Sequence, residues 1–274
     1  MALISNSRSD PLIVDSSPPR PIAIVSAMHE ELGALLAQMP DEQRIQVGGR
    51  DFWVGHLQGH LIVAVLSRIG KVAAATTAAV LLERFGARAI VFTGVAGGLA
   101  PGVEVGDVVV ATKLLQHDLD ASPIFPKYEV PLTGHARFAA DTEISDALAT
   151  VAADVLSDPV TLLGEKVADD FALAAPKVHR GLLISGDRFV STLAESEALR
   201  RALPDALAVE MEGAAVAQVC HDFGVPFAAV RTISDRADDA AHGDFTRFVS
   251  SVASRYSLAL VSAWLATLPD AAST

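Results

Sequence analysis

The stretch Ala89-Ile-Val-Phe-Thr-Gly-Val-Ala-Gly-Gly98 decides the fold of this chain. From Ala89 to Thr93 every residue is apolar or β-branched, which is typical of a strand buried on both faces. The strand runs directly into a loop that contains Gly94, Gly97 and Gly98. A buried strand with this ending indicates the interior of an α/β sheet, where ligands bind beyond the carboxyl ends of the strands.

Segments with strand and helix patterns alternate on both sides of this stretch. Strand patterns lie at Pro21–Ser26, Phe52–Val54, Leu61–Leu66, Val108–Thr112, Gly181–Ser185, Ala208–Met211 and Pro226–Ile233. Helical patterns lie at Glu30–Leu36, Val72–Phe85, Asp141–Leu156, Glu195–Ala202, Gly213–Phe223 and Phe245–Leu268. The alternation predicts an α/β fold, specifically a three-layer sandwich in which helices flank a mixed, mainly parallel, twisted sheet. Residues 118–134 carry three prolines and are predicted to form a long loop.

The length of 274 residues favours one domain, which we expect over residues 21–270. Residues 1–20 are rich in Ser, Pro and Asp and are predicted to form a flexible N-terminal extension. Hydrophobic residues make up 51% of the chain and the mean hydropathy is +0.38. No apolar run reaches the roughly 18 residues of a membrane-spanning helix, so no membrane partner is expected.

The net charge and the cysteine content exclude several classes of protein. A formal charge of −12 disfavours binding to nucleic acid, which requires clustered Lys and Arg. The single cysteine, Cys220, excludes an intrachain disulfide and fits a cytoplasmic location. Cys and His residues do not have the spacing of a zinc site, so neither a metal nor an organic cofactor is predicted.

Three acidic residues stand just beyond the ends of predicted strands. Glu31 follows the first strand, Glu212 follows the strand at Val209, and Asp235 follows the strand at Ile233. Each has an ordinary structural explanation, since Glu31 suits the first turn of a helix and Asp235 suits a turn or helix cap. Acids beside strongly apolar strands are nevertheless uncommon unless they are paired or functional. Their recurrence after separate strands predicts a ligand-binding crevice but does not name the ligand.

Eight sequence blocks, in one order across residues 21–268, resemble a known family. They are Ser26–Glu31, Ile69–Val72, Thr93–Leu99, Val105–Val108, His117–Asp118, Ser185–Phe189, Val209–Gly213 and Arg231–Asp235. Together they are similar to the 5′-methylthioadenosine/S-adenosylhomocysteine nucleosidases of the nucleoside phosphorylase superfamily. The resemblance implies a hydrolase that releases adenine from such nucleosides and leaves a 5-thioribose product. It also implies a homodimer in which the partner subunit completes each pocket.

The resemblance also implies roles for individual residues. Asp235 would be the general acid that protonates adenine N7, Glu31 the base that activates water, and Glu212 the ligand of the ribose hydroxyls. This division suits the chemistry, because cleavage of an N-glycosidic bond builds negative charge on the base and positive charge on the sugar. The other substrate-binding positions implied are Ala96, Gly97, Phe189, Val190, Glu210, Met211, Arg231, Ser234 and Phe245. Among these, Phe189 would stack on adenine and Phe245 would form a wall for the 5′ substituent.

Alternatives stay open at this point. Glu30 and Glu31 occupy the loop where phosphorylases of the superfamily carry an anion-binding arginine, which favours water over phosphate. Arg68 keeps a phosphate-dependent purine nucleoside phosphorylase under consideration. Futalosine or 5′-deoxyadenosine are further candidate substrates, and a catalytically silent nucleoside-binding protein is a third class. Residues 120–134 depart from the typical family sequence, so the 5′ substituent is not predicted.

Overall fold

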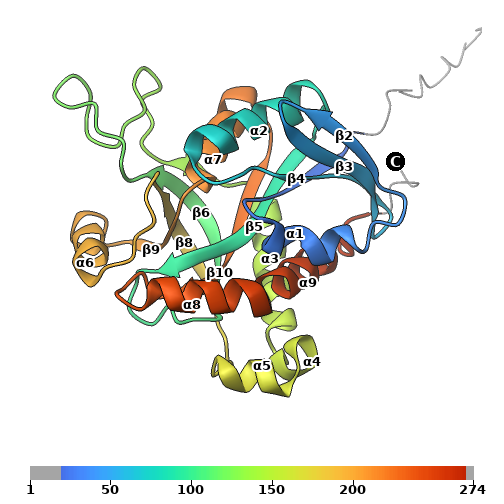
Figure 1. Cartoon of the computed structure of the whole chain (residues 1–274). Coiled ribbons are helices and arrows are strands. Elements are labelled where there is room, and N and C mark those ends of the chain that lie inside the picture. Colours follow the sequence, from blue (N-terminus) through green and yellow to red (C-terminus); the bar gives the residue numbers. More distant parts are fainter. Residues whose placement is uncertain (1–19, 270–274) are drawn as a thin grey trace, which may run out of the picture.

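A mixed sheet runs through the centre of the molecule (Figure 1). The structure is a computed structural model that describes residues 20–269. Its strands are β1 (Ile22–Ser26), β2 (Gln43–Val47), β3 (Arg50–Leu57), β4 (His60–Leu66), β5 (Ala89–Gly98), β6 (Val108–Gln116), β7 (Phe138–Ala139), β8 (Val178–Ser185), β9 (Ala206–Glu210) and β10 (Phe227–Asp235). Their order in the sheet is β10, β6, β8, β9, β5, β1, β4, β3, β2, and β7 pairs with β6.

One half of the sheet closes on itself. β10 pairs with β5 as well as with β6, so β5, β9, β8, β6 and β10 form a closed barrel. Five of the ten pairings between described strands are parallel, so the sheet is mixed but not mainly parallel. The predicted α/β class with a mixed sheet between helices is confirmed. The closure was not foreseen in the predicted sandwich, because a strand's sequence pattern reports its burial and not its neighbours.

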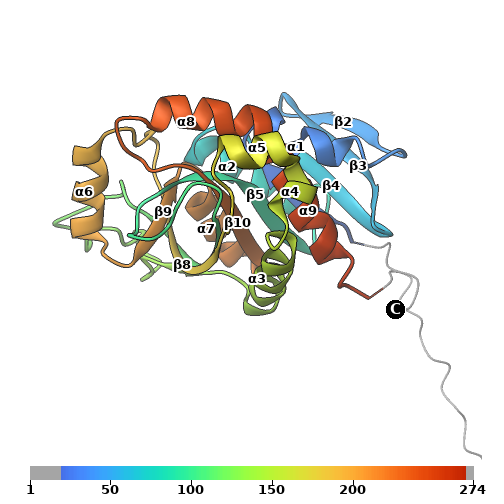
Figure 2. The same cartoon turned by 90° about the horizontal axis from the view of Figure 1, so that it is seen from below.

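Helices cover both faces of the sheet, and alternate residues of β1 show why. Ile22 and Ile24 point into one apolar cluster, and Ala23 and Val25 point into another. The first cluster is formed with α1 (His29–Leu36), α3 (Thr142–Val155) and α9 (Ser254–Leu265), and the second with α2 (Lys71–Glu83) and α7 (Gly213–Phe223). Figure 1 shows α2 and α7 along one side of the sheet, and Figure 2 shows α8 (Ala241–Phe248) and α9 across the other.

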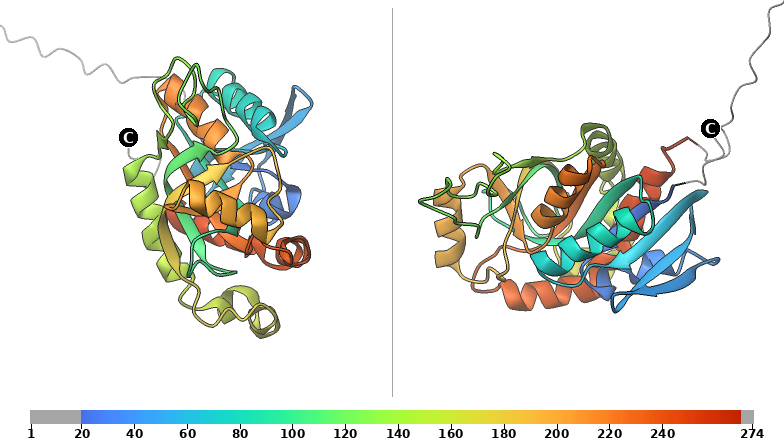
Figure 3. Two further views of the ribbon diagram at one scale, coloured as in Figure 1. Left: turned by 90° about the vertical axis from the view of Figure 1, so that its left-hand side faces the viewer. Right: turned by 90° about the horizontal axis from the view of Figure 1, so that it is seen from above.

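The remaining helices lie away from the centre. α4 (Pro159–Leu163) and α5 (Glu165–Asp170) project at one end of the molecule, and α6 (Leu193–Ala202) flanks β9 (Figures 1 and 3). The predicted helix 213–223 is confirmed with the same bounds. The predicted closing helix is longer, because α8 begins at Ala241 and continues through the π-helical turn Val249–Ala253 into α9.

The stretch Gly94–Gly98, predicted to be a loop, is instead the end of β5, because it pairs with β10 and β9. Two further regions differ from the sequence pattern or lie outside the structure. β2 was not predicted, because all but one of its residues are exposed and their polar character hides an edge strand. The predicted flexible extension over residues 1–20 lies outside the described residues except for Arg20. Within residues 20–269 no helix has both the length and the apolarity that crossing a membrane requires.

Candidate active site

Strand register brings the ends of four strands together. Gly97, near the end of β5, lies opposite Val209 of β9 and opposite Asp235 of β10. The register of β10 shifts between Ile233 and Asp235, where a bulge turns the strand end. Ser185 at the end of β8 lies opposite Glu210. The strands of the closed barrel therefore deliver their polar terminal residues to one place.

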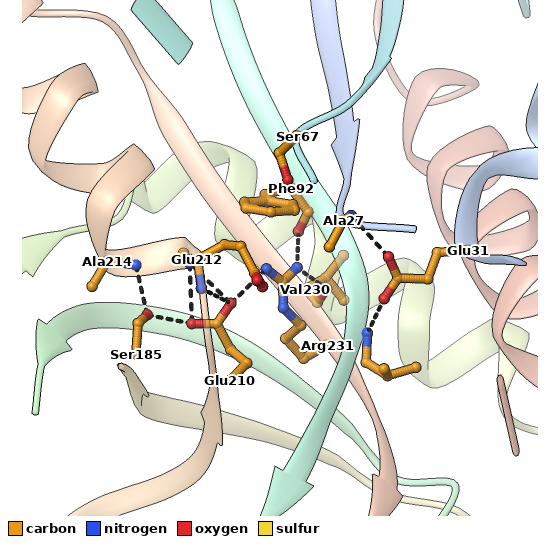
Figure 4. A network of polar contacts seen from close by, with 12 residues as sticks. Ala27, Glu31, Ser67, Phe92, Ser185, Glu210, Glu212, Ala214, Val230 and Arg231 are labelled. Carbon is orange, nitrogen blue, oxygen red and sulfur yellow. Dashed lines mark hydrogen bonds and ion pairs between the residues drawn. The ribbon is translucent and has the colours of Figure 1, made fainter. Parts of the chain in front are cut away.

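Glu31 is held by backbone N–H groups from two strand ends (Figure 4). Its Oε2 accepts hydrogen bonds from Ala27 N (2.8 Å) and Met28 N (2.9 Å), and its Oε1 accepts one from Val95 N (3.0 Å). The side chain is buried, and a Cβ at Gly94 would stand only 2.7 Å from Glu31 Oε1. Glycine at position 94 therefore leaves the space that the carboxylate occupies.

The electrostatic environment of Glu31 combines burial with stabilising groups. Burial raises the pKa of Glu31, while the positive charge of Arg231 and the three backbone N–H donors act in the opposite direction. The carboxylate is thus a base of increased strength whose ionised form has fixed partners.

Asp235 is the second buried carboxyl group. Its Oδ2 accepts a hydrogen bond from Ser234 Oγ (2.8 Å), and its Oδ1 accepts one from Ala237 N (2.8 Å). A Cβ at Gly97 would come within 2.9 Å of Asp235 Oδ1. Burial raises the pKa of Asp235, opposed by the hydrogen bonds from Ala237 and Ser234. The direction of this shift suits a group that carries a proton to its substrate.

Glu212 is the N-cap residue just before helix α7 and faces the same space. Its Oε1 accepts a hydrogen bond from Gly70 N (2.8 Å). Burial, followed by the negative charge of Glu210, raises the pKa of Glu212 to about 8. A carboxyl group with this pKa exchanges its proton near neutral pH and can pair with hydroxyl groups in either state.

Glu210 belongs to a buried network behind these groups (Figure 4). Its Oε2 lies 2.9 Å from Arg231 Nη2, and its two oxygens accept hydrogen bonds from Gly213 N at 3.0 and 2.9 Å. Ser185 Oγ donates to Glu210 Oε1 and accepts from Ala214 N. The guanidinium of Arg231 also donates to Phe92 O (2.9 Å) and stacks over the Phe92 ring at 4.1 Å. This network fixes the start of α7 and therefore the position of Glu212.

A cavity of about 350 Å³ opens onto the three carboxyl groups. The rings of Phe189 and Phe245 meet edge to face at its wall, with centroids 5.4 Å apart. The lining residues are Ala27, Met28, Glu31, Ile69, Val95, Ala96, Gly97, Arg188, Phe189, Val190, Val209, Glu210, Met211, Glu212, Ser234, Asp235, His242 and Phe245. Within residues 20–269 no group of three or more His, Cys, Asp or Glu side chains is arranged to hold a metal.

Comparison with known proteins gives a single answer. The model of the phosphorylase superfamily matches residues 21–266. A 5′-methylthioadenosine/S-adenosylhomocysteine nucleosidase of Anoxybacillus flavithermus is 36% identical over 232 residues, which cover 85% of this chain and 92% of that protein. The chain belongs to this nucleosidase family.

Solved structures of family members are similar along most of the chain. The nucleosidase of Neisseria meningitidis, in complex with methylthio-immucillin-A, has a TM-score of 0.78 at 33% identity, over 91% of this chain and 100% of that one. The S-adenosylhomocysteine nucleosidase of Streptococcus pyogenes, in complex with 5-methylthiotubericidin, has a TM-score of 0.79 at 33% identity, over 93% and 99%.

The structure places all but one of the predicted site residues of this nucleosidase-family chain on the cavity. The exception is Arg231, whose side chain is buried behind the wall in its pair with Glu210. The substrate-binding role predicted for Arg231 is therefore not matched by a direct contact with the cavity.

Several lining residues carried no predicted role. Met28 and Ile69 belong to quoted sequence blocks, but nothing in the sequence says that both side chains face the cavity. His242 lies in α8, seven residues beyond Asp235, and has no motif of its own. The sequence signal that could have found these residues is proximity along the chain. Met28 lies three residues before Glu31, Ile69 precedes Gly70, and His242 lies three residues before Phe245.

Proposed function

We propose that this chain hydrolyses the N-glycosidic bond of 5′-methylthioadenosine, S-adenosylhomocysteine or both, giving adenine and the 5-thioribose product. The observation that carries the proposal is the convergence of Glu31, Glu212 and Asp235 on one apolar cavity with aromatic walls. Family membership supports the same reaction, since the relatives are nucleosidases acting on these nucleosides by name.

Asp235 acts as the general acid in this proposal. The bond between C1′ and N9 breaks as negative charge develops on adenine, and the proton of Asp235 passes to N7 of the leaving base. Support comes from the raised pKa of Asp235 and from the Ser234 and Ala237 donors, which hold the orientation of the carboxyl group. Protonation at N7 neutralises the negative charge that develops on the leaving adenine, and this makes the adenine a better leaving group.

Glu31 acts as the general base. Water adds to C1′, and its proton passes to the Glu31 carboxylate, whose raised pKa increases its basicity. The positive charge that develops on the ribose is stabilised by the nearby carboxylates. Glu212 accepts hydrogen bonds from the ribose hydroxyls while Met211 contacts the sugar, and both residues line the cavity.

The remaining lining residues position the nucleoside. Phe189 stacks on adenine, the Val190 backbone binds the base edge, and Phe245 packs against the 5′ substituent. Ala96 and Gly97 leave room for the ribose and base, since a side chain at Gly97 would collide with Asp235. Glu210 acts through Arg231 and the start of α7 rather than by binding phosphate or water.

Phosphorolysis is not supported by the charges on the cavity. Arg188 is the one arginine among the described lining residues, and its guanidinium pairs with Glu195. Arg68, which kept the phosphorylase alternative open, does not line this cavity. A phosphate ion beside Glu31 would therefore meet a carboxylate without an opposing free cation on the wall.

The deciding experiment measures adenine release from 5′-methylthioadenosine and S-adenosylhomocysteine in phosphate-free buffer. We expect full activity without phosphate and formation of the free thioribose. Activity that requires phosphate and yields a pentose 1-phosphate would replace the proposal with phosphorolysis. The same assay includes futalosine and 5′-deoxyadenosine, and faster cleavage of either one would show that it is the preferred nucleoside.

We further propose a cytoplasmic homodimer. Large apolar side chains are exposed at the start of α2 and in the 117–137 segment, where Val72 is 78% and Leu132 is 91% exposed. Burial of such side chains against a second copy is favourable. Light scattering on the purified chain tests the expected mass of two subunits.

A further inference from the structure

A second cavity adjoins the first at the end where Met28 and Ile69 stand. Its volume is about 480 Å³, and Ala27, Met28 and Ile69 line both cavities. Phe245, the proposed wall for the 5′ substituent, lines the first cavity together with Ile69. A long 5′ substituent that passes Met28 and Ile69 would enter the second cavity.

Two arginines without acidic partners line this second cavity. Within residues 20–269, neither Arg50 nor Arg68 has a carboxylate within ion-pair distance, whereas Arg44 on the adjacent strand pairs with Asp51 at 2.7 Å. Arg50 donates to the carbonyls of Gly48 (3.2 Å) and Ala73 (3.1 Å), and Arg68 donates to the carbonyl of Gly49. Backbone carbonyls orient both guanidinium groups but leave their charges uncompensated.

The two arginines also influence each other. Partial burial, followed by the positive charge of Arg68, lowers the pKa of Arg50, and the Arg50 Nε is buried without a hydrogen-bond partner among the described residues. Arg68 has a φ of +66°, a left-handed conformation that is unfavourable for a residue with a side chain. Two like charges kept together, one of them on a strained backbone, fit an anionic ligand that binds both.

The acidic residues of the second cavity complete the pattern. Asp51 is neutralised by Arg44, whereas Glu30 in the first turn of α1 is exposed and has no ion-pair partner within the described part of the chain. A pair of arginines and one separate carboxylate are complementary to a zwitterion, with its carboxylate on the arginines and its ammonium on Glu30.

We propose that Arg50 and Arg68 bind the α-carboxylate of an amino acid at the end of the 5′ thioether, so that S-adenosylhomocysteine is preferred to 5′-methylthioadenosine. This inference rests on the proposed nucleosidase function and adds to it a subsite for the charged tail. The tail lies beyond the sulfur, remote from the bond that breaks, so its contacts favour substrate binding and not the chemical step.

The test compares S-adenosylhomocysteine with 5′-butylthioadenosine, which has an uncharged tail of similar length, and with 5′-methylthioadenosine. In Arg50→Gln/Arg68→Gln, we expect kcat/KM for S-adenosylhomocysteine relative to 5′-butylthioadenosine to fall by about tenfold or more, through KM. Glu30→Gln lowers the same ratio. Arg88→Gln is the matched control, because it removes an exposed arginine that lines neither cavity, and its ratio equals that of the wild type.

The outcomes separate the subsite from the reaction. An unchanged ratio in the double variant, with all three nucleosides still cleaved, overturns the subsite and leaves the nucleosidase function intact. A wild-type protein that cleaves none of them overturns the function itself. Stimulation by inorganic phosphate that depends on Arg68 and yields a pentose 1-phosphate assigns the arginines to a phosphate ion and overturns the subsite.

A measurement on the wild-type protein covers the case in which the double variant does not fold. Contacts between charged groups at an open site weaken with ionic strength. The kcat/KM ratio of S-adenosylhomocysteine to 5′-butylthioadenosine is therefore expected to fall as salt is raised. A ratio that is independent of salt contradicts the charged subsite.

Discussion

The two adjoining cavities differ in their charged groups: buried carboxyl groups line the first, whereas a pair of arginines lines the second together with Glu30 and Asp51. In the first, Glu31, Glu212 and Asp235 are buried and each accepts a hydrogen bond from at least one backbone N–H. In the second, Arg50 and Arg68 stand on the β2–β3 hairpin and after β4, nearer to solvent, and donate to backbone carbonyls. Buried and rigidly bonded groups suit bond cleavage, whereas exposed cations suit recognition of a ligand's charge. Substitutions in the first cavity should therefore abolish turnover, and substitutions in the second should alter preference.

Asp235→Asn should give the largest effect and sharpen this comparison most. An amide cannot supply the proton that adenine N7 needs, so kcat falls by about 10²–10⁴. The measurement is adenine release at saturating 5′-methylthioadenosine, and Asp239→Asn, an exposed neighbour, serves as the control. Wild-type turnover in Asp235→Asn would remove this residue from the role of acid.

Glu31→Gln should lower kcat/KM on the order of 10²-fold, because the base is lost. The amide also cannot accept on both sides as the carboxylate does from Ala27, Met28 and Val95, so about 1–3 kcal/mol of unfolding free energy is lost as well. Steady-state kinetics and urea denaturation measure the two effects separately. A variant that loses stability but keeps its turnover would make Glu31 a structural residue only.

Gly94→Ala should lower kcat/KM by roughly tenfold or more, because the new Cβ displaces Glu31. The expected contact of 2.7 Å with Glu31 Oε1 leaves no room for the carboxylate in its present position. Gly243→Ala is the matched control, since a Cβ there meets no atom within 4 Å. Equal kinetics in the two variants would show that the exact position of Glu31 is unimportant.

Glu212→Gln should change the pH dependence of stability. The folded-state pKa of about 8 lies above the ordinary glutamate value of 4.5, so the protonated form stabilises the fold and this contribution is lost as pH rises through about 8. Glutamine stays neutral at every pH. The difference in melting temperature, variant minus wild type, should therefore increase by roughly several degrees between pH 5 and pH 9. Glu83→Gln, at an exposed position of α2, is the control. A difference that does not vary with pH contradicts the raised pKa.

Arg68→Gly and Arg68→Ala give the smallest expected difference. Both remove the guanidinium, but only alanine keeps a Cβ in the left-handed conformation, so the glycine variant should be more stable by about 1 kcal/mol. Chemical denaturation of the two variants measures this difference. Equal stabilities would show that the backbone relaxes and that no strain is held at the second cavity.

Much of the fold and of the first cavity could be predicted from sequence. The run Ala89–Thr93 and the helix 213–223 carry strong patterns, and the site residues that the family resemblance implied all line the first cavity apart from Arg231. β2 and the closure of β10 onto β5 could not be predicted, because an exposed edge strand and a strand's choice of neighbour leave no periodic signal. The second cavity was equally hidden, since Arg50 and Arg68 are separated in sequence and belong to no quoted motif in common.

The sequence by itself determined which residues are apolar enough to be buried, where glycine is available at strand ends, and that Glu31, Glu212 and Asp235 stand at or just beyond strand ends. These are local properties, set by side-chain type and spacing. Only the tertiary structure decided that Gly97 lies between Val209 and Asp235, that Arg231 stands behind the wall, and that Arg50 and Arg68 line one cavity that adjoins the first. The physical reason is that strand register and barrel closure depend on packing between distant segments, and a charge acquires its role from the neighbours that this packing supplies.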